Sequence, residues 1–186
     1  NSGILPTFPA GIRKSELITL MTQVVHISSG SGGPTIAGKR HIALAMYIRG
    51  KAFIGSAILL KRQANSEPMH YVVLHLLCQG IEITLKGLLL LRDYDQYKPH
   101  LKGIGHNLCR AACEASTAFG FKNPDGDVAA EFTALNNLYS RHFMRYSSVF
   151  DIFVDPRSVA WKKVLRRIGA AIRIAERELK RDASII

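Results

Sequence analysis

The longest apolar segment of the chain, residues 71–91, is interrupted by one narrow polar stripe. The members of this stripe are His75, Gln79, Glu82 and Lys86. Steps of four, three and four residues place these side chains on one face of a helix. The remaining surface is apolar, which is typical of a central helix that other helices surround. Ionised Glu82 and Lys86 would each cost about 3 kcal/mol in a bilayer, so we interpret the segment as the core helix of a soluble protein without a membrane partner.

Apolar positions at helical spacing recur on both sides of this segment and predict further helices. Pro68 suits a first helical turn, Asp127 is a predicted N-cap, and Asp155 is the predicted N-cap of the last helix. The predicted helices cover residues 37–62, 68–92, 106–119 and 127–145, and a C-terminal segment that begins at residue 156. The polar residues 93–105 are predicted to form a loop.

Residues 1–36 are the least regular part of the chain, because Pro6, Pro9 and the Gly- and Ser-rich run 28–34 break any long element. Alternating strand patterns are nearly absent after residue 36. The length of 186 residues suits one domain. The sequence therefore predicts an all-α fold, an antiparallel bundle of four to five helices in residues 37–182, with an irregular N-terminal arm in residues 1–36.

The formal net charge of +11 is high for a chain with otherwise ordinary composition. Residues 157–182 alone hold nine basic and three acidic side chains, a net charge of +6. Such a surface attracts polyanions, among them RNA, DNA and acidic proteins. The alternative is a solvated face of an amphipathic helix without a nucleic-acid role.

The cysteines, Cys78, Cys109 and Cys113, are odd in number and form no C-x-x-C pair. They predict reduced thiols in a cytoplasmic protein. His106, Cys109 and Cys113 share a helical face, but a closed zinc site needs four ligands and small buried thiols suit a core equally well. We therefore expect neither a bound metal nor a cofactor.

Residues 33–40 approach the phosphate-binding pattern G-x-x-x-x-G-K-[ST], with Arg40 where the pattern needs a hydroxyl for magnesium. We interpret these residues as the lead-in to the first helix. Arg141 and Arg145 are one helical turn apart, so they suit a phosphate clamp, or equally the basic end of a helix. No serine or cysteine nucleophile motif and no paired carboxylates stand out, so hydrolases of those types are not expected.

Several short passages resemble the HEPN superfamily, the higher eukaryotes and prokaryotes nucleotide-binding domain. They are the helix through residues 45–60, the E-x-x-x-K pattern at Glu82 and Lys86, the G-H-[DN]-L pattern at residues 105–108, and the R-Y ending at residues 145–146. Their order and spacing carry the resemblance over about residues 37–180.

The resemblance implies a helical bundle that forms a homodimer. Members of that superfamily include metal-independent ribonucleases of toxin–antitoxin, phage-defence and RNA-processing systems, and non-catalytic proteins that bind RNA, nucleotides or proteins. RNA or a nucleotide, and an antitoxin or other protein, are thus the expected partners. The R-x(4–6)-H motif of the ribonucleases does not carry over, because seven residues separate Arg62 from His70 and Arg92 from His100.

Metal-free RNA cleavage needs a base for the 2′-hydroxyl and a cation for the phosphate. We expect His106 and Arg145 as catalytic candidates. The binding candidates are Glu82, Lys86, Asn107, Arg141 and Tyr146. A structural alternative stays open, in which Glu82 and Lys86 form a one-turn ion pair and His106 holds the third helix to the central one. Three hypotheses follow: a bundle that binds RNA or a nucleotide, a divergent ribonuclease, and a protein-interaction module.

Overall fold

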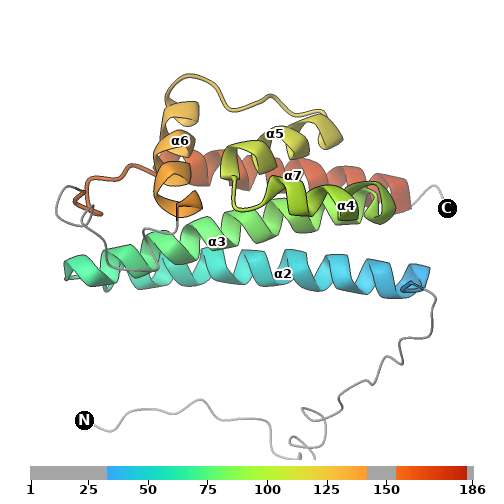
Figure 1. Cartoon of the computed structure of the whole chain (residues 1–186), viewed down its shortest axis with the longest axis horizontal. Helices are drawn as coiled ribbons and strands as arrows, with labels where there is room; N and C mark the ends of the chain where they lie inside the picture. The colour runs from blue at the N-terminus through green and yellow to red at the C-terminus, as the bar shows by residue number, and fades with distance from the viewer. Residues whose placement is uncertain (1–32, 142–153, 184–186) are drawn as a thin grey trace, which may run out of the picture. The chain divides into compact units, whose positions relative to one another are not determined.

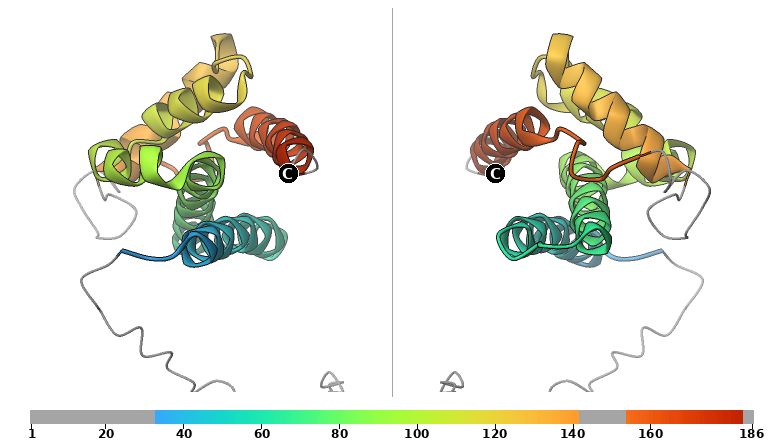
Figure 2. Two further views of the ribbon diagram at one scale, coloured as in Figure 1. Left: turned by 90° about the vertical axis from the view of Figure 1, so that its right-hand side faces the viewer. Right: turned by 90° about the vertical axis from the view of Figure 1, so that its left-hand side faces the viewer.

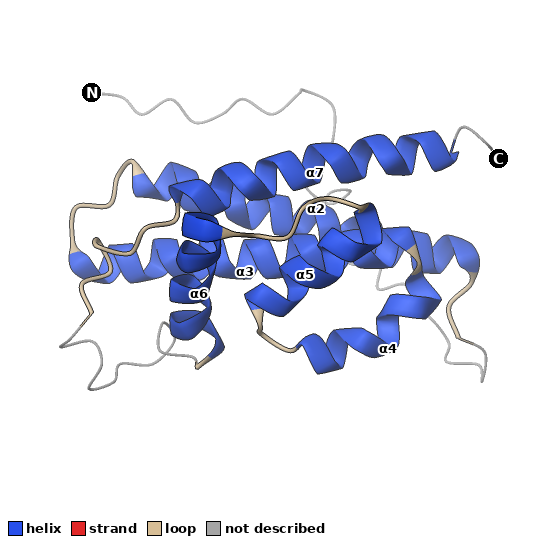
Figure 3. Cartoon of the chain, turned by 90° about the horizontal axis from the view of Figure 1, so that it is seen from above, coloured by secondary structure: helices blue, strands red, loops and turns tan. Residues whose placement is uncertain are grey.

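The computed structural model describes residues 33–141 and 154–183. The chain divides into two units, Asn1–Pro34 and Thr35–Ile186, and the second holds every described helix. These helices are α2 (Ile36–Lys61), α3 (Glu67–Arg92), α4 (Tyr94–Ile104), α5 (Leu108–Phe119), α6 (Gly126–Ser140) and α7 (Lys162–Ala183) (Figure 1). No strand occurs in these ranges (Figure 3), so the all-α class is confirmed. The expectation for residues 1–32 lies outside the described residues.

Helices α2 and α3 pack closely and run antiparallel. A Cβ atom added at Gly50 would lie 2.4 Å from Oγ1 of Thr84, and one added at Gly87 would lie 2.7 Å from the backbone N of Tyr47. In these two contacts the residue number on α3 decreases as the residue number on α2 increases, so the two helices run antiparallel. Only glycine permits such a close backbone approach at these two positions.

Helix α3 is the central element, as its sequence predicts. Leu77, Ile81, Leu88 and Leu89 are completely buried. Viewed end-on, α3 lies between α2 on one side and the helices α5 and α6 on the other (Figure 2). Helix α7 lies beside α3 and also contacts α2, where Oε1 of Glu176 accepts hydrogen bonds from the hydroxyl of Tyr47 at 2.5 Å and from Nζ of Lys51 at 2.9 Å. The same arrangement places Glu82 and Lys86 of the polar stripe inside the bundle rather than at its surface.

The prediction of a loop at residues 93–105 is wrong, because α4 occupies this segment. The Asp93 carboxylate accepts a hydrogen bond from the backbone N–H of Gln96 at 2.9 Å and so caps the helix. Tyr97 and Ile104 are buried and pack α4 against the rest of the protein. The mostly polar composition of the segment gave no indication of this packing. Pro99 lies inside the helix without ending it.

Two predicted helix starts also need correction. Helix α6 begins at Gly126 after Asp125, and Asp127 lies in its first turn. Asp155 does not cap the last helix, because its carboxylate accepts hydrogen bonds from the backbone N and the Nε of Arg157, both at 2.9 Å, within a turn. Helix α7 begins later, at Lys162.

Among the described residues, two helical segments, α2 and Pro68–Arg92, are long and apolar enough to cross a membrane by length and composition alone. In its most apolar 18-residue stretch the Pro68–Arg92 segment is 72% buried within the protein, as a core helix is, whereas the corresponding stretch of α2 is only 28% buried. Core helices of soluble proteins pass the same test. The cytoplasmic location therefore stays a prediction.

Candidate functional site

A buried carboxylate, Glu82, joins three parts of the fold. Its Oε1 accepts a hydrogen bond from Nζ of Lys86 at 2.7 Å, within α3. Its Oε2 accepts one from the hydroxyl of Tyr139 on α6 at 2.6 Å and lies 3.0 Å from Nδ1 of His106. We call these four residues the Glu82 network. The Glu82 side chain is 8% exposed, whereas that of His106 is 43% exposed, so the network reaches solvent at the imidazole.

The local sequence explains how the network forms. Glu82 and Lys86 are one helical turn apart on α3. Gly105 has a φ of 55°, a left-handed value that glycine adopts readily, and it ends α4. Its carbonyl oxygen accepts a hydrogen bond from Nζ of Lys86 at 2.6 Å, which fixes the turn on α3. His106 follows directly and therefore faces Glu82.

Asn107 has a structural role at the start of α5. Its side-chain oxygen accepts a hydrogen bond from the backbone N–H of Arg110 at 2.8 Å. The amide oxygen of Asn136 on α6 accepts another from the backbone N–H of Leu108 at 2.8 Å. These two caps fix the position of α5, and with it the preceding His106.

The electrostatics of the Glu82 network favour an ionised carboxylate. Burial raises the pKa of Glu82, but hydrogen bonds from Lys86, Tyr139 and His106 outweigh this effect and lower the pKa below its usual value. Because the carboxylate faces Nδ1 of His106, we assign the proton of a neutral imidazole to that nitrogen. The lone pair of Nε2 then points away from Glu82, in the orientation that a general base requires.

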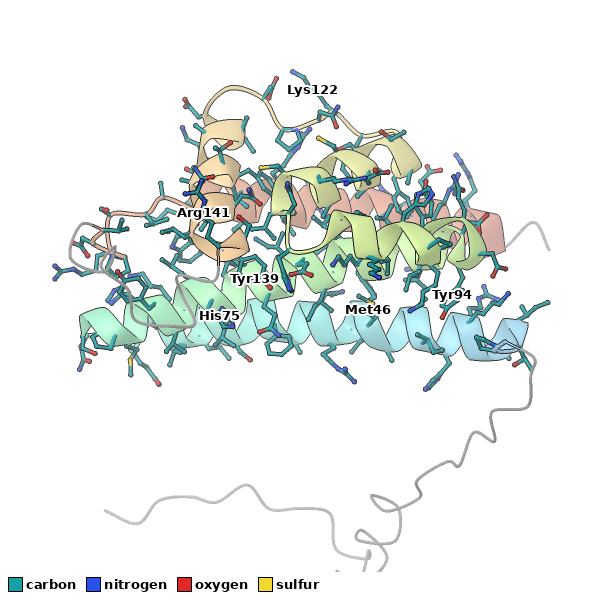
Figure 4. All side chains as sticks on the ribbon, viewed as in Figure 1. Met46, His75, Tyr94, Lys122, Tyr139 and Arg141 are labelled. Atoms are coloured by element: carbon teal, nitrogen blue, oxygen red, sulfur yellow. The ribbon has the colours of Figure 1, made fainter. Side chains whose placement is uncertain are left out.

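Sequence reasoning missed Tyr139 as a site residue. Its buried ring lies edge-on to that of His106, with ring centroids 5.8 Å apart, and 5.9 Å from the ring of His75. Tyr139 and His75 are seen together between α6 and α3 (Figure 4). Phe132, Leu135 and Tyr139 recur at helical spacing on the buried face of α6, and this periodicity was the available signal.

The remaining site candidates do not join the Glu82 network in the described residues. Arg141 is exposed at the C-terminal end of α6. Arg145 and Tyr146 lie outside the described residues, so the expected pairing of His106 with Arg145 has no described geometry. The contacts of Glu82, Lys86 and His106 are those of the structural alternative, in which His106 holds the start of α5 to α3.

The described residues bring no three His, Cys, Asp or Glu side chains together in a metal-binding group. Cys78, Cys109 and Cys113 are free thiols, and Cys78 is buried. The phosphate-loop-like residues start α2, where Oγ1 of Thr35 accepts a hydrogen bond from the backbone N–H of Gly38 at 3.2 Å.

A basic cleft lies where α2 ends and α7 begins. It has a volume of about 530 Å³. We define the basic cleft by its lining, which is Lys61, Glu131, Arg157, Ser158, Val159, Ala160, Trp161, Lys162, Lys163 and Arg166. Five of these side chains are basic and one is acidic. The cleft thus concentrates part of the positive charge that residues 157–182 carry.

Comparison with known proteins adds no relative, because no protein-family model, curated protein or solved structure matches the chain.

Proposed function

We propose that the chain is a HEPN-like helical bundle that binds RNA or a nucleotide through its basic surface. The observation that carries this proposal is the set of exposed cations along α7. Among the residues that the structure describes, no carboxylate forms an ion pair with Lys162, Arg166 or Arg173. Cations without such partners on one helix are suited to phosphates, since phosphate contacts release counterions from the nucleic acid.

Charge reversal tests which surface binds RNA. Arg173 on α7 and Arg49 on α2 are both exposed, so Arg173→Glu and Arg49→Glu change the net charge equally without disturbing the core. We expect Arg173→Glu to weaken binding of a labelled single-stranded RNA about tenfold, and Arg49→Glu to weaken it less than threefold. Equal losses in the two variants would contradict a role for α7.

A second candidate, a divergent metal-independent ribonuclease, is supported by the contact between Glu82 and His106. A buried carboxylate in contact with Nδ1 orients the imidazole and fixes the tautomer in which Nε2 carries the lone pair, and such a nitrogen can accept the proton of a ribose 2′-hydroxyl. Arg141 or Arg145 would supply the cation for the phosphate. This candidate predicts RNA cleavage in the presence of a chelator.

The ribonuclease candidate is tested by comparing two histidine variants. His106→Ala should abolish cleavage, whereas His100→Ala should not, because His100 is an exposed residue of α4. Cleavage that persists unchanged in His106→Ala would exclude His106 as the base and point to other residues or to a contaminating nuclease.

The exposed apolar face of α2 supports a third candidate, a protein-interaction module that forms a homodimer or takes an antitoxin-like partner. Leu44, Ile48 and Leu59 share this face and are large apolar side chains that are 46%, 57% and 63% exposed. An apolar surface of this kind on a protein is a common mark of an interface. We expect a second copy of the chain to cover it.

A further inference from the structure

The basic cleft has the dimensions and the walls of a small-ligand site. Its volume of about 530 Å³ lies within the range of about 300 to 1,000 Å³ that is common for ligand pockets. Three elements line it: the last residue of α2, Lys61; Glu131 of α6; and the segment from Arg157 to Arg166. None of these residues belongs to the Glu82 network.

The one carboxylate of the cleft is already engaged. Oε2 of Glu131 accepts hydrogen bonds from the backbone N–H groups of Lys163, at 2.8 Å, and Val164, at 3.1 Å. It therefore caps the N-terminus of α7 and offsets the positive end of that helix. Glu131 forms no ion pair with a cation of the cleft among the described residues.

Three of the five cations of the cleft form no ion pair with a carboxylate of the described residues. Arg157 is paired with Asp155 at 2.9 Å, and Lys163 is paired with Asp127. In the described ranges, no carboxylate forms an ion pair with Lys61, Lys162 or Arg166. These three side chains converge on one cavity from two helices, so an anion there would be held from two sides.

Trp161 gives the cleft an aromatic wall. The side chain packs partly against the hydrophobic core and also lines the cleft, so the core limits the motion of the ring. Nucleobases stack on such aromatic rings whatever their sequence, and neighbouring cations bind the attached phosphates. The cleft thus offers an aromatic wall and phosphate-binding cations in one cavity.

We propose that the basic cleft binds one nucleotide unit, with its base against Trp161 and its phosphate between Lys61, Lys162 and Arg166. This inference rests on the proposed RNA or nucleotide binding and assigns a site to it. A free nucleotide and a nucleotide within an RNA strand present the same base and phosphate. Adenosine diphosphate and a short single-stranded RNA are therefore both suitable probes.

Trp161 is the only tryptophan in the chain, so its fluorescence reports on this cleft alone. We expect adenosine diphosphate or an RNA tetramer to quench it saturably at constant ionic strength. Arg166→Ala should weaken the binding about tenfold, because it removes a charged hydrogen-bond donor. Arg49→Ala is the matched control, since Arg49 is an exposed arginine of α2 outside the cleft, and it should change the affinity less than twofold.

The possible results separate this inference from the proposed function. Quenching by inorganic pyrophosphate as strong as that by adenosine diphosphate would overturn the role of the base. Equal effects of Arg166→Ala and Arg49→Ala would overturn the cleft as the site. Unchanged Trp161 emission while labelled RNA still binds by anisotropy would overturn the cleft but leave RNA binding in place. If neither Trp161 quenching nor a change in RNA anisotropy is observed, both the nucleotide site in the cleft and the proposed RNA or nucleotide binding are overturned.

Discussion

Glu82 is a buried acid that remains a carboxylate because three side chains hydrogen-bond to it. Burial alone would raise its pKa, but the contacts from Lys86, Tyr139 and His106 lower it below the usual value of 4.5. A group whose pKa is lower in the folded than in the unfolded state stabilises the fold above its unfolded pKa. That stabilisation is lost as the pH falls through the folded pKa.

Glu82→Gln should therefore destabilise the protein in a pH-dependent way. At pH 7 we expect a loss of about 2 kcal/mol in the free energy of unfolding, because Lys86 and Tyr139 lose a charged acceptor. The loss should shrink as the pH falls below about 4.5, the ordinary pKa of glutamate. Urea unfolding at several pH values measures the difference in the free energy of unfolding between the wild-type protein and Glu82→Gln. A deficit that is constant from pH 7 to pH 3 would contradict the ionised carboxylate.

The three thiols should differ in reactivity. Burial, and secondarily the nearby Glu82 charge, raise the pKa of Cys78, so its thiolate is scarce and inaccessible. Cys113 is exposed. We expect Cys113→Ser to remove the fast phase of reaction with a disulfide reagent on the folded protein, and Cys78→Ser to leave that phase intact. A fast phase that depends on Cys78 would contradict the buried position of this residue.

Sequence reasoning reached part of the candidate site. The ion pair of Glu82 and Lys86 follows from their spacing within one helix, and the helix start at residues 105–108 drew attention to His106. Tyr139 was missed because its contact with Glu82 joins residues 57 positions apart and depends on how α6 packs on α3. Such contacts arise from tertiary packing, which no local pattern encodes.

At the scale of elements, helical periodicity identified α2, α3 and the packed face of α7. It missed α4, because its polar residues conceal the buried Tyr97 and Ile104 and because Pro99 suggested a loop. The close packing of α2 on α3 could not be predicted from the sequence either. A glycine inside a helix indicates only a low helix propensity, and it does not indicate which helix packs against it. The structure shows that Gly87 is needed for contact with Tyr47.

Two glycine substitutions test this packing. A Cβ atom at Gly87 would lie 2.7 Å from the backbone N of Tyr47, so Gly87→Ala must separate α2 from α3 and should cost about 2 kcal/mol or more. Gly55→Ala is the matched control, because nothing lies within 4 Å of its added Cβ. Higher helix propensity should stabilise that variant by up to about 1 kcal/mol. Thermal unfolding of Gly87→Ala and Gly55→Ala measures these changes in stability. Equal changes in the two variants would contradict the close approach of α2 and α3 at Gly87.

At the scale of the whole molecule, α2 carries five of the six large apolar side chains that are exposed in the described residues. It packs mainly on α3, on the opposite side of α3 from α5 and α6 (Figures 1 and 2). Ile48 is 57% exposed and Leu59 63% exposed along its outer side. A second copy of the chain would bury these side chains through the same surface on both subunits.

We expect the protein to be a dimer that Ile48→Glu converts to a monomer, because a charge at the centre of the apolar face would be desolvated in the dimer. Gln96→Glu adds a negative charge at an exposed position of α4 and should leave the dimer intact. Sedimentation equilibrium measures the mass of each protein. A wild-type monomer at high concentration would exclude the homodimer.

The central claim is that the basic surface binds RNA through its phosphates. The most direct test is the anisotropy of a labelled single-stranded RNA with the wild-type protein at 50 mM and 200 mM salt. About three phosphate contacts give a slope near −2 in log affinity against log salt, so we expect the affinity to fall about twentyfold. An affinity that does not change with salt, or no binding at 50 mM salt, would contradict the claim.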